Sequence, residues 1–259
     1  MPRFDRNGWL ILTARGLRSF AFGLNSVTLG LYLAQLGLGG EQIGLVLSAA
    51  LAGTLALTVV ITLWGDRIGR RRMLVGGSAL MGVAALIPLV GDQPLALALI
   101  ALSGMVAVTS NESTGLQTID QAVLPQSVPA GQRTAAFAFY NVIAGGGAAL
   151  GALAVGGLPP LAAQLGLVGP QVYAPAFALY ALTGLAGALI QGRLDGRVES
   201  GERVARRLGI DRSRGVVARL ALLFSLDSLA GSLVVQSFLA YFFASRFGAD
   251  AGALGLLFG

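Results

Sequence analysis

Long apolar stretches separated by short polar connections dominate the pattern of this chain. A helix that crosses the roughly 30 Å hydrocarbon core of a bilayer needs about 20 apolar residues. Seven stretches have about this length and an eighth begins after them: 9–36, 42–64, 73–90, 95–124, 133–157, 171–191, 216–244 and 251–259. The pattern therefore predicts an all-α polytopic membrane protein.

One connection is longer than the others and highly charged. It runs over residues 192–215 and is the natural boundary between two bundles. We therefore expect a six-helix bundle in residues 1–191, a central loop in 192–215 and the start of a second bundle in 216–259. The sequence ends inside an apolar run, where half a helix would leave its carbonyl groups unsatisfied in lipid. We therefore also expect a partial sequence.

The composition agrees with a membrane location and excludes several kinds of catalytic and metal site. The chain is 55% hydrophobic and 12% charged, whereas a typical soluble domain is about 25% charged, so a soluble α/β domain is a poor alternative. It contains no Cys, no His and no Lys. This excludes the usual zinc sites, catalytic triads and the P-loop lysine. We expect no enzyme activity, no metal, no cofactor and no use of ATP.

The arginines predict how the helices are oriented. If the helices alternate in direction, 17 of the 18 arginines fall on one side of the membrane, and only Arg246 falls on the other. Positive charge is retained on the cytoplasmic side. We therefore expect a cell-membrane protein whose N-terminus and 192–215 loop are cytoplasmic, and we attribute the net charge of +6 to topology rather than to nucleic-acid binding.

The connection between the second and third stretches carries an ordered motif. It contains Gly65, Asp66, Arg67, Gly69, Arg70 and Arg71. Asp66 is expected to accept hydrogen bonds from the N-terminus of the third helix. Gly69 allows a tight turn, and the arginines can anchor the helix at the lipid headgroups. The alternative is an ordinary positively charged cytoplasmic loop.

In residue order and position, this motif resembles the signature loop of the major facilitator superfamily, D-R-x-G-R-R-x-x-L. The resemblance implies a fold of twelve helices in two halves. It also implies a secondary transporter (permease) that moves a small solute by alternating access, with ion or proton coupling, as a monomer at full length. Departures at Thr62, Ile100 and Ala152 weaken a more specific role in proton-coupled drug efflux. We expect residues 1–259 alone not to transport.

Two alternatives from other classes stay open. A seven-helix receptor or sensor fits the number of stretches, but such receptors usually place the N-terminus outside, against the arginine pattern. A membrane-embedded enzyme lacks the His, Cys and Lys residues on which most such chemistry depends.

Ionisable side chains within the stretches are candidate site residues, because each costs about 2.5–3.5 kcal/mol to insert. Arg18 in the first stretch and Asp227 in the seventh lie at similar depths. The resemblance implies that these two helices face each other across a central cavity, so we expect Arg18 and Asp227 to form an ion pair or a charged substrate site. Alternatively, both are anchors that extend to the cytoplasmic surface.

The fourth stretch becomes polar in its inner half, where Glu112 and Asp120 lie on one helical face. Glu112 is either a proton-carrying or substrate-binding carboxylate, or a structural partner. Asp120 is interpreted as a structural partner of Arg70, Arg71 or Arg133 in a cytoplasmic gate. The polar run could also mark a helix that is broken at the site.

Other polar groups at mid-depth complete the set of candidates. Asn25, Tyr140, Asn141 and Gln236 could line a central cavity, or could form hydrogen bonds between helices. The glycines of 145–151 are expected at a close helix crossing rather than in a phosphate loop, since no lysine follows them.

Overall fold

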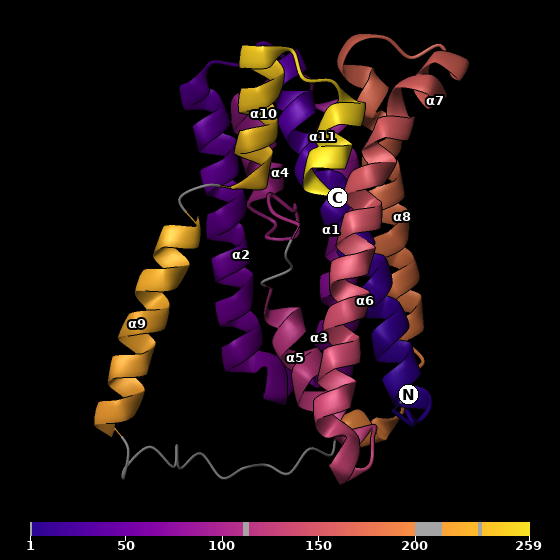
Figure 1. Ribbon diagram of the computed structural model, residues 1–259, viewed down its shortest axis with the longest axis vertical. Coiled ribbons are helices and arrows are strands. Elements are labelled where there is room, and N and C mark those ends of the chain that lie inside the picture. The colour runs from indigo at the N-terminus through magenta and orange to yellow at the C-terminus, as the bar shows by residue number, and fades with distance from the viewer. Residues whose placement is uncertain (1, 111–113, 200–213, 233–234) are drawn as a thin grey trace.

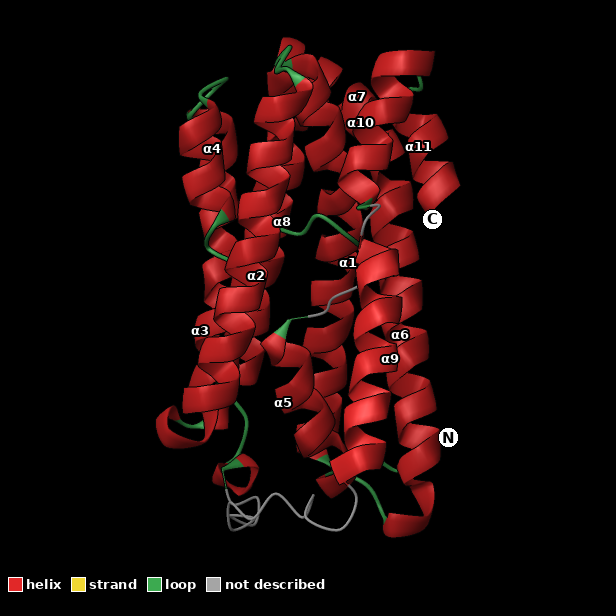
Figure 2. Ribbon diagram, turned by 90° about the vertical axis from the view of Figure 1, so that its left-hand side faces the viewer, coloured by secondary structure: helices red, strands yellow, loops and turns green. Residues whose placement is uncertain are grey.

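The computed structural model describes residues 2–110, 114–199, 214–232 and 235–259 (Figure 1). Every regular element in these residues is a helix (Figure 2), so the expected all-α class is confirmed. In chain order the elements are α1 (Arg6–Gln35), α2 (Gly40–Ile68), α3 (Arg70–Leu80), η1 (Met81–Leu89), α4 (Pro94–Ala101), α5 (Gly115–Val123), η2 (Leu124–Gln126), η3 (Ala130–Gln132), α6 (Arg133–Ala154), η4 (Val155–Gly157), α7 (Leu158–Gln164), η5 (Gly169–Tyr173), α8 (Ala174–Gln191), η6 (Gly196–Val198), α9 (Arg214–Ser232), α10 (Gln236–Phe247) and α11 (Ala251–Phe258).

Helix α1 is the central element of the bundle. Its 30 residues extend about 45 Å at 1.5 Å per residue, and 21 of them are buried. Its N-terminus is capped by Asp5, whose Oδ1 accepts from the backbone N–H of Gly8 at 2.8 Å. Helices α6, α8 and α10 pack around it. Because neighbouring helices cover α1, it can carry polar side chains that would be costly in contact with lipid.

The surrounding helices are apolar on their outer faces. In the described part of the chain, four helical segments are long and apolar enough to cross a membrane: Gly40–Gly65, Arg70–Leu89, Ala130–Gln164 and Gly169–Gln191. Between 22% and 44% of each apolar window is buried within the protein. The exposed remainder is rich in leucine and valine, as expected for a surface in contact with lipid.

The expected fourth helix, residues 95–124, is not continuous. Helix α4 ends at Ala101 and α5 begins at Gly115. Gly104 has a φ of +77°, which L-residues with side chains rarely adopt. The prediction of one spanning helix is therefore wrong, and the alternative of a broken helix is confirmed.

The expected seventh helix, residues 216–244, also consists of two helices. Helix α9 ends at Ser232 and α10 begins at Gln236, with Val235 in an extended conformation. Described side chains of α9 are exposed from 215 to 226, whereas α10 packs against α1 and α11 packs against α6. Figure 1 shows α9 standing apart from the bundle, with α10 and α11 against its upper part.

Helices α1 and α6 cross at a glycine-lined contact. A Cβ atom at Gly151 would lie 2.8 Å from the backbone N of Leu24, and one at Gly147 would lie 2.9 Å from the carbonyl oxygen of Gly16. The expected close crossing is confirmed at these two glycines. It is not formed by Gly145 or Gly146, where an added Cβ would meet nothing within 4 Å.

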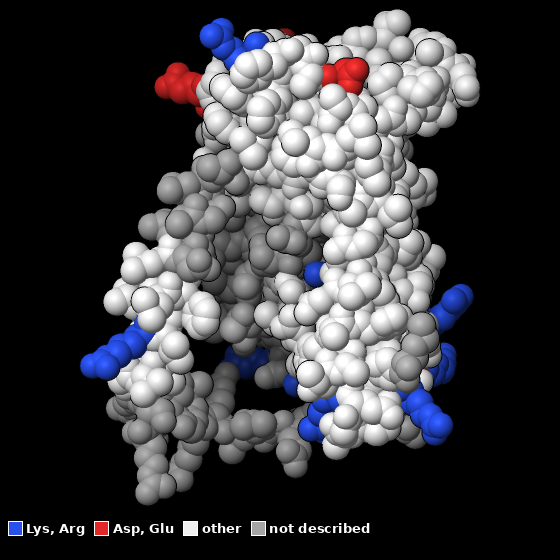
Figure 3. All heavy atoms as spheres, in the orientation of Figure 1, with Lys and Arg blue, Asp and Glu red and all other residues white. Residues whose placement is uncertain are grey.

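Arginine side chains gather at one end of the molecule (Figure 3). We call the end that holds the N-terminus, the α2–α3 turn and residues 124–132 the arginine-rich end. The far end holds the α1–α2 turn, the α3–α4 connection around Gly91 and the α10–α11 turn.

Candidate functional site

A buried ion pair joins α1 to α5. The Nη2 of Arg18 donates to Oδ2 of Asp120, and the two side chains are 2% and 1% exposed. Arg18 follows the start of α1 by 12 residues, or about 18 Å along the helix. A charge at this depth is costly unless a partner of opposite charge accompanies it, so the pair determines how α1 and α5 face each other.

Tyr140 of α6 extends the pair on the Asp120 side. Its hydroxyl donates to Oδ2 of Asp120 at 3.4 Å. The guanidinium of Arg15, also buried, lies 4.9 Å from the centre of the Tyr140 ring, a geometry in which a cation is attracted to the ring face. Arg15 and Arg18 of α1 therefore both contact the group that Asp120 and Tyr140 form.

Gln191, at the end of α8, extends the pair on the Arg18 side. With its amide oxygen toward Arg18, it accepts from Nη1 at 3.0 Å and donates to Oγ of Ser78 at 2.7 Å and to the carbonyl of Leu74 at 2.8 Å. The orientation of the Gln191 amide is assigned from its neighbours: the guanidinium of Arg18 can only donate hydrogen bonds, so the atom that faces it is the amide oxygen. We call Arg15, Arg18, Ser78, Asp120, Tyr140 and Gln191 the charge cluster; it connects helices α1, α3, α5, α6 and α8.

A second site forms where the fourth stretch is broken. Nδ2 of Asn25, in α1, donates to the carbonyl oxygen of Ala107 at 2.9 Å. Oε1 of Gln236, at the start of α10, accepts from the backbone N–H of Ser110 at 3.0 Å. Two of the predicted mid-depth candidates therefore bind the same non-helical segment, 102–110. Their hydrogen bonds satisfy some of the backbone N–H and C=O groups that a continuous helix would have paired internally.

Further side chains hold the same segment from other helices. Tyr180 of α8 donates to the carbonyl of Met105, and Thr54 of α2 donates to the carbonyl of Gly104 at 3.2 Å. The backbone N–H of Ser237 donates to Val108 at 3.0 Å, and its hydroxyl donates to the carbonyl of Ser26 at 2.6 Å. Groups of α1, α2, α8 and α10 thus converge on one unwound segment inside the bundle.

The signature loop is held by a residue that the sequence analysis did not select. Glu199 accepts from the backbone N–H groups of Arg70 and Arg71 at 2.9 and 3.0 Å. A carboxylate is favourable there because the N-terminus of α3 carries a partial positive charge. Gly69 has a φ of +105°, so the expected tight turn is confirmed.

Glu199 thus caps the N-terminus of α3, while the cap expected from Asp66 stays a prediction. The side chain of Asp66 lies outside the described residues. Close by, Arg6 forms an exposed ion pair with Asp195 at 3.1 Å. Residues 195–199 therefore contact the starts of both α1 and α3 at the arginine-rich end.

The structure places the remaining predicted residues as follows. Asp120 pairs with Arg18 rather than with the loop arginines proposed for it. The side chain of Asp227 and residue Glu112 lie outside the described residues, so the Arg18–Asp227 pair and both roles of Glu112 stay predictions. Asn141 is exposed, and its side chain forms no hydrogen bond with another described residue.

Sequence reasoning missed Gln191, Ser78 and Glu199. Of the three, Gln191 was the easiest to recognise from the sequence, since it is an amide at the end of an otherwise apolar helix. Within the described residues, no group of three or more His, Cys, Asp or Glu residues could hold a metal ion. The charge cluster contains a carboxylate, which can bind or release a proton, and two guanidinium groups, which can pair with an anion.

Comparison with known proteins agrees with this architecture. An uncharacterized membrane protein of Saccharomyces cerevisiae is 27% identical over 251 residues, which cover 84% of this chain and 56% of the relative. Synaptic vesicle glycoprotein 2A of rat and of mouse is 34% identical over 116 residues, or 43% of this chain and 15% of the relative. The chain thus spans about half the length of the yeast protein and less of the mammalian ones. No solved structure matches it.

The helical bundle, the signature loop and the buried charges fit one family of membrane proteins. The sequence profile of the Major Facilitator Superfamily matches residues 11–259, nearly the whole chain. The chain is thus an all-α polytopic membrane protein that belongs to the Major Facilitator Superfamily.

Proposed function

We propose that this chain forms the first bundle, and the start of the second, of a secondary active transporter that moves a small solute by alternating access. The observation that carries the proposal is the buried Arg18–Asp120 pair with its contacts to Tyr140 and Gln191. Ionisable groups within a membrane bundle are expensive and mark solute or proton pathways. Membership of the superfamily favours this function over that of a receptor.

The unwound segment between α4 and α5 supplies the solute-binding part of the proposal. Transporters place their sites near the middle of the membrane, where discontinuous helices expose backbone groups. Oδ1 of Asn25 is buried without a hydrogen-bond partner among the described residues, although Nδ2 of the same side chain is used. A solute that donates a hydrogen bond to Asn25 would satisfy this acceptor.

The packing of α10 and the exposure of α9 support a transport cycle in which the far end can close. At the far end, α10 lies against α1: a Cβ at Gly30 would lie 2.8 Å from Cβ of Ala240 and 3.0 Å from N of Tyr241. Toward the arginine-rich end, the described side chains of α9 are exposed. If the arginine-rich end is cytoplasmic, these contacts would correspond to an inward-facing state of the proposed transporter.

Proton coupling would use Asp120, because a protonated carboxyl no longer balances the charge of Arg18. Coupling is tested with the protein encoded by the complete reading frame, reconstituted in liposomes and screened against radiolabelled solutes with an imposed pH gradient. Asp120→Asn should lose gradient-driven accumulation yet retain exchange of labelled for unlabelled solute. Asn25→Ala should lose both, since it alters the binding segment.

The matched control is Asp195→Asn, which removes an acidic group from an exposed pair at the arginine-rich end. It should keep both activities. Rates are compared per amount of monodisperse protein, so that a loss of folded protein is not taken for a loss of transport. Full accumulation by Asp120→Asn would exclude Asp120 from coupling, and the absence of transport for every solute in the panel would contradict the proposed function.

A further inference from the structure

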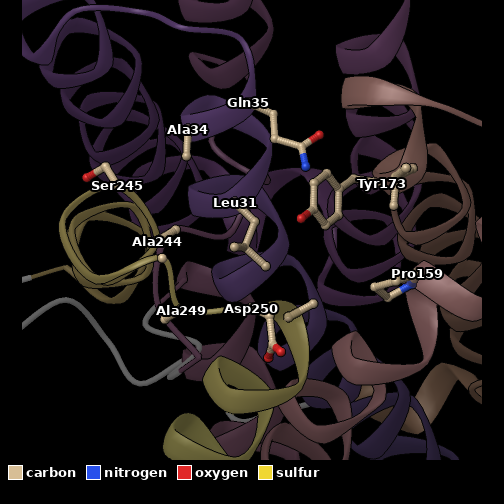
Figure 4. Close-up of a pocket in the computed structure, with 12 residues that line it drawn as sticks. Leu31, Ala34, Gln35, Pro159, Tyr173, Ala244, Ser245, Ala249 and Asp250 are labelled. Carbon is tan, nitrogen blue, oxygen red and sulfur yellow. The ribbon is translucent and has the colours of Figure 1, made fainter.

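A pocket of about 500 Å³ (Figure 4) opens at the far end of the molecule. None of its lining residues belongs to the charge cluster or to the unwound segment. We call it the far-end pocket. Its first wall is the end of α1, with Leu31 and Gln35. Its second is formed by Pro159 and Tyr173, and its third by the α10–α11 turn, with Asp250. Pockets of this size accommodate small organic molecules.

Tyr173 directs an unused polar group into this pocket. The residue is only 5% exposed, and its hydroxyl has no hydrogen-bond partner among the described residues. In Figure 4 the Tyr173 ring extends toward Leu31 and Gln35 from the opposite wall. A hydroxyl on a largely buried side chain is favourable only if something bonds to it, so the pocket offers this group to a ligand or to water.

Asp250 gives the pocket its charge. The chain turns at Gly248, which has a φ of +66°, and Asp250 then caps α11 by accepting from the backbone N–H of Ala253 at 2.7 Å. This contact fixes the carboxylate and uses Oδ1, while Oδ2 bonds to no other described residue. The lining contains no basic side chain. The pocket therefore has one fixed negative charge.

We propose that the far-end pocket binds a small protonated amine that carries an apolar group. The ammonium group would lie at Asp250, in a pocket that also offers the hydroxyl of Tyr173, and the apolar group would lie against Leu31 and Pro159. Asp92 and Glu41 are also at this end, together with one basic residue, Arg246, so the described charges here are negative in sum and would raise the local concentration of a cation. The inference does not rest on the proposed function, because binding can be measured without transport.

The test uses benzylamine as the probe, with benzyl alcohol and benzoate as neutral and anionic comparators of similar size. Binding is measured by titration calorimetry on the protein in nanodiscs of zwitterionic lipid, with empty nanodiscs subtracted. Benzylamine should bind at least about tenfold more tightly than either comparator, the equivalent of one charge-assisted hydrogen bond.

The key variant is Asp250→Asn, which removes the charge and keeps the helix cap, because asparagine caps helices as well as aspartate does. It should weaken benzylamine binding about tenfold. Tyr173→Phe, which keeps the ring and removes the hydroxyl, should weaken it severalfold. The control is Asp5→Asn, which makes the same exchange at the cap of α1 at the other end and should leave binding unchanged.

Three outcomes would overturn the proposal. One is the absence of saturable benzylamine binding to the wild-type protein. Another is binding of benzoate or benzyl alcohol as tight as that of benzylamine. The third is wild-type affinity in Asp250→Asn. If Asp250→Asn does not fold, the Tyr173→Phe variant decides, and wild-type affinity there would also overturn the proposal.

Discussion

Replacing Asp120 with asparagine tests the central ion pair by its effect on stability. The exchange is nearly isosteric and keeps an oxygen that can accept from Arg18 and from Tyr140. It removes the negative charge that faces the guanidinium. Because both side chains of the pair are at most 2% exposed, water cannot replace that charge without a rearrangement of α1 and α5.

The expected magnitude follows from this burial. Removing one member of a buried pair costs about 3–5 kcal/mol, because it leaves the other charge uncompensated. For a chain of this length, 1 kcal/mol corresponds to roughly 2–4 °C in Tm, so Asp120→Asn should lower the Tm by about 6–20 °C. The double variant Arg18→Leu/Asp120→Leu removes both charges and should be more stable than either single neutralisation.

The measurement is thermal unfolding in detergent, followed by far-UV circular dichroism, which suits a chain whose regular elements are helices. Scans use one fixed rate, since unfolding of membrane proteins is often irreversible and its midpoint depends on that rate. The control is Asp195→Asn, whose pair with Arg6 is 45% and 65% exposed and should contribute less than about 1 kcal/mol. Equal Tm values for Asp120→Asn and Asp195→Asn, or purely additive losses in the double variant, would refute the reasoning.

Three further predictions concern the α1–α6 crossing, the turn at Gly69 and the orientation of the chain. Gly151→Val should separate α1 from α6, because its Cβ would lie 2.8 Å from backbone atoms of α1. Overpacking of this kind costs about 1–3 kcal/mol of stability. The control Gly146→Ala adds a Cβ that meets nothing within 4 Å, so it should be neutral or stabilising in the same thermal unfolding experiment. Gly69→Ala should cost about 1–3 kcal/mol through its φ of +105°, and a wild-type melt would contradict this. Since the chain has no cysteine, single cysteines introduced at Gly91 and Gly131 can be labelled with a membrane-impermeant maleimide. We expect the cysteine at position 91 to be labelled only from outside the cell and the one at position 131 only from inside. The reverse pattern would refute the predicted orientation.

The class of fold could be predicted from the sequence because the apolar stretches are long and the signature loop has a specific order of residues. The sequence also selected Arg18, Asp120 and Asn25 by the cost of polar groups in lipid. It did not predict that Arg18 pairs with Asp120, since the two are 102 residues apart and the rotation of one helix against another depends on packing that a linear pattern does not contain. For the same reason Glu199, in a charged connection, could not be recognised as the cap of α3.

The two-part fourth stretch shows a different limit. Its apolar composition predicts a continuous helix, and only its run of polar residues favoured a break. The segment is non-helical because side chains of four other helices satisfy its backbone groups, Asn25 and Gln236 among them. Such compensation is a property of the assembled bundle and is absent from the local sequence.

The arginines of α1 have a consequence for how the protein is made. Although α1 is the longest of the described helices, it is not among the four described segments whose length and composition suit a membrane span. Its partner carboxylate is synthesised 102 residues after Arg18, an interval of about 5–20 s at ordinary rates of translation. During that interval Asp120 is not yet available to balance the charge of Arg18, so α1 lacks one of the contacts that offset the cost of an arginine in lipid. The first helix to be synthesised should therefore reach its final packing only after α5 has been made.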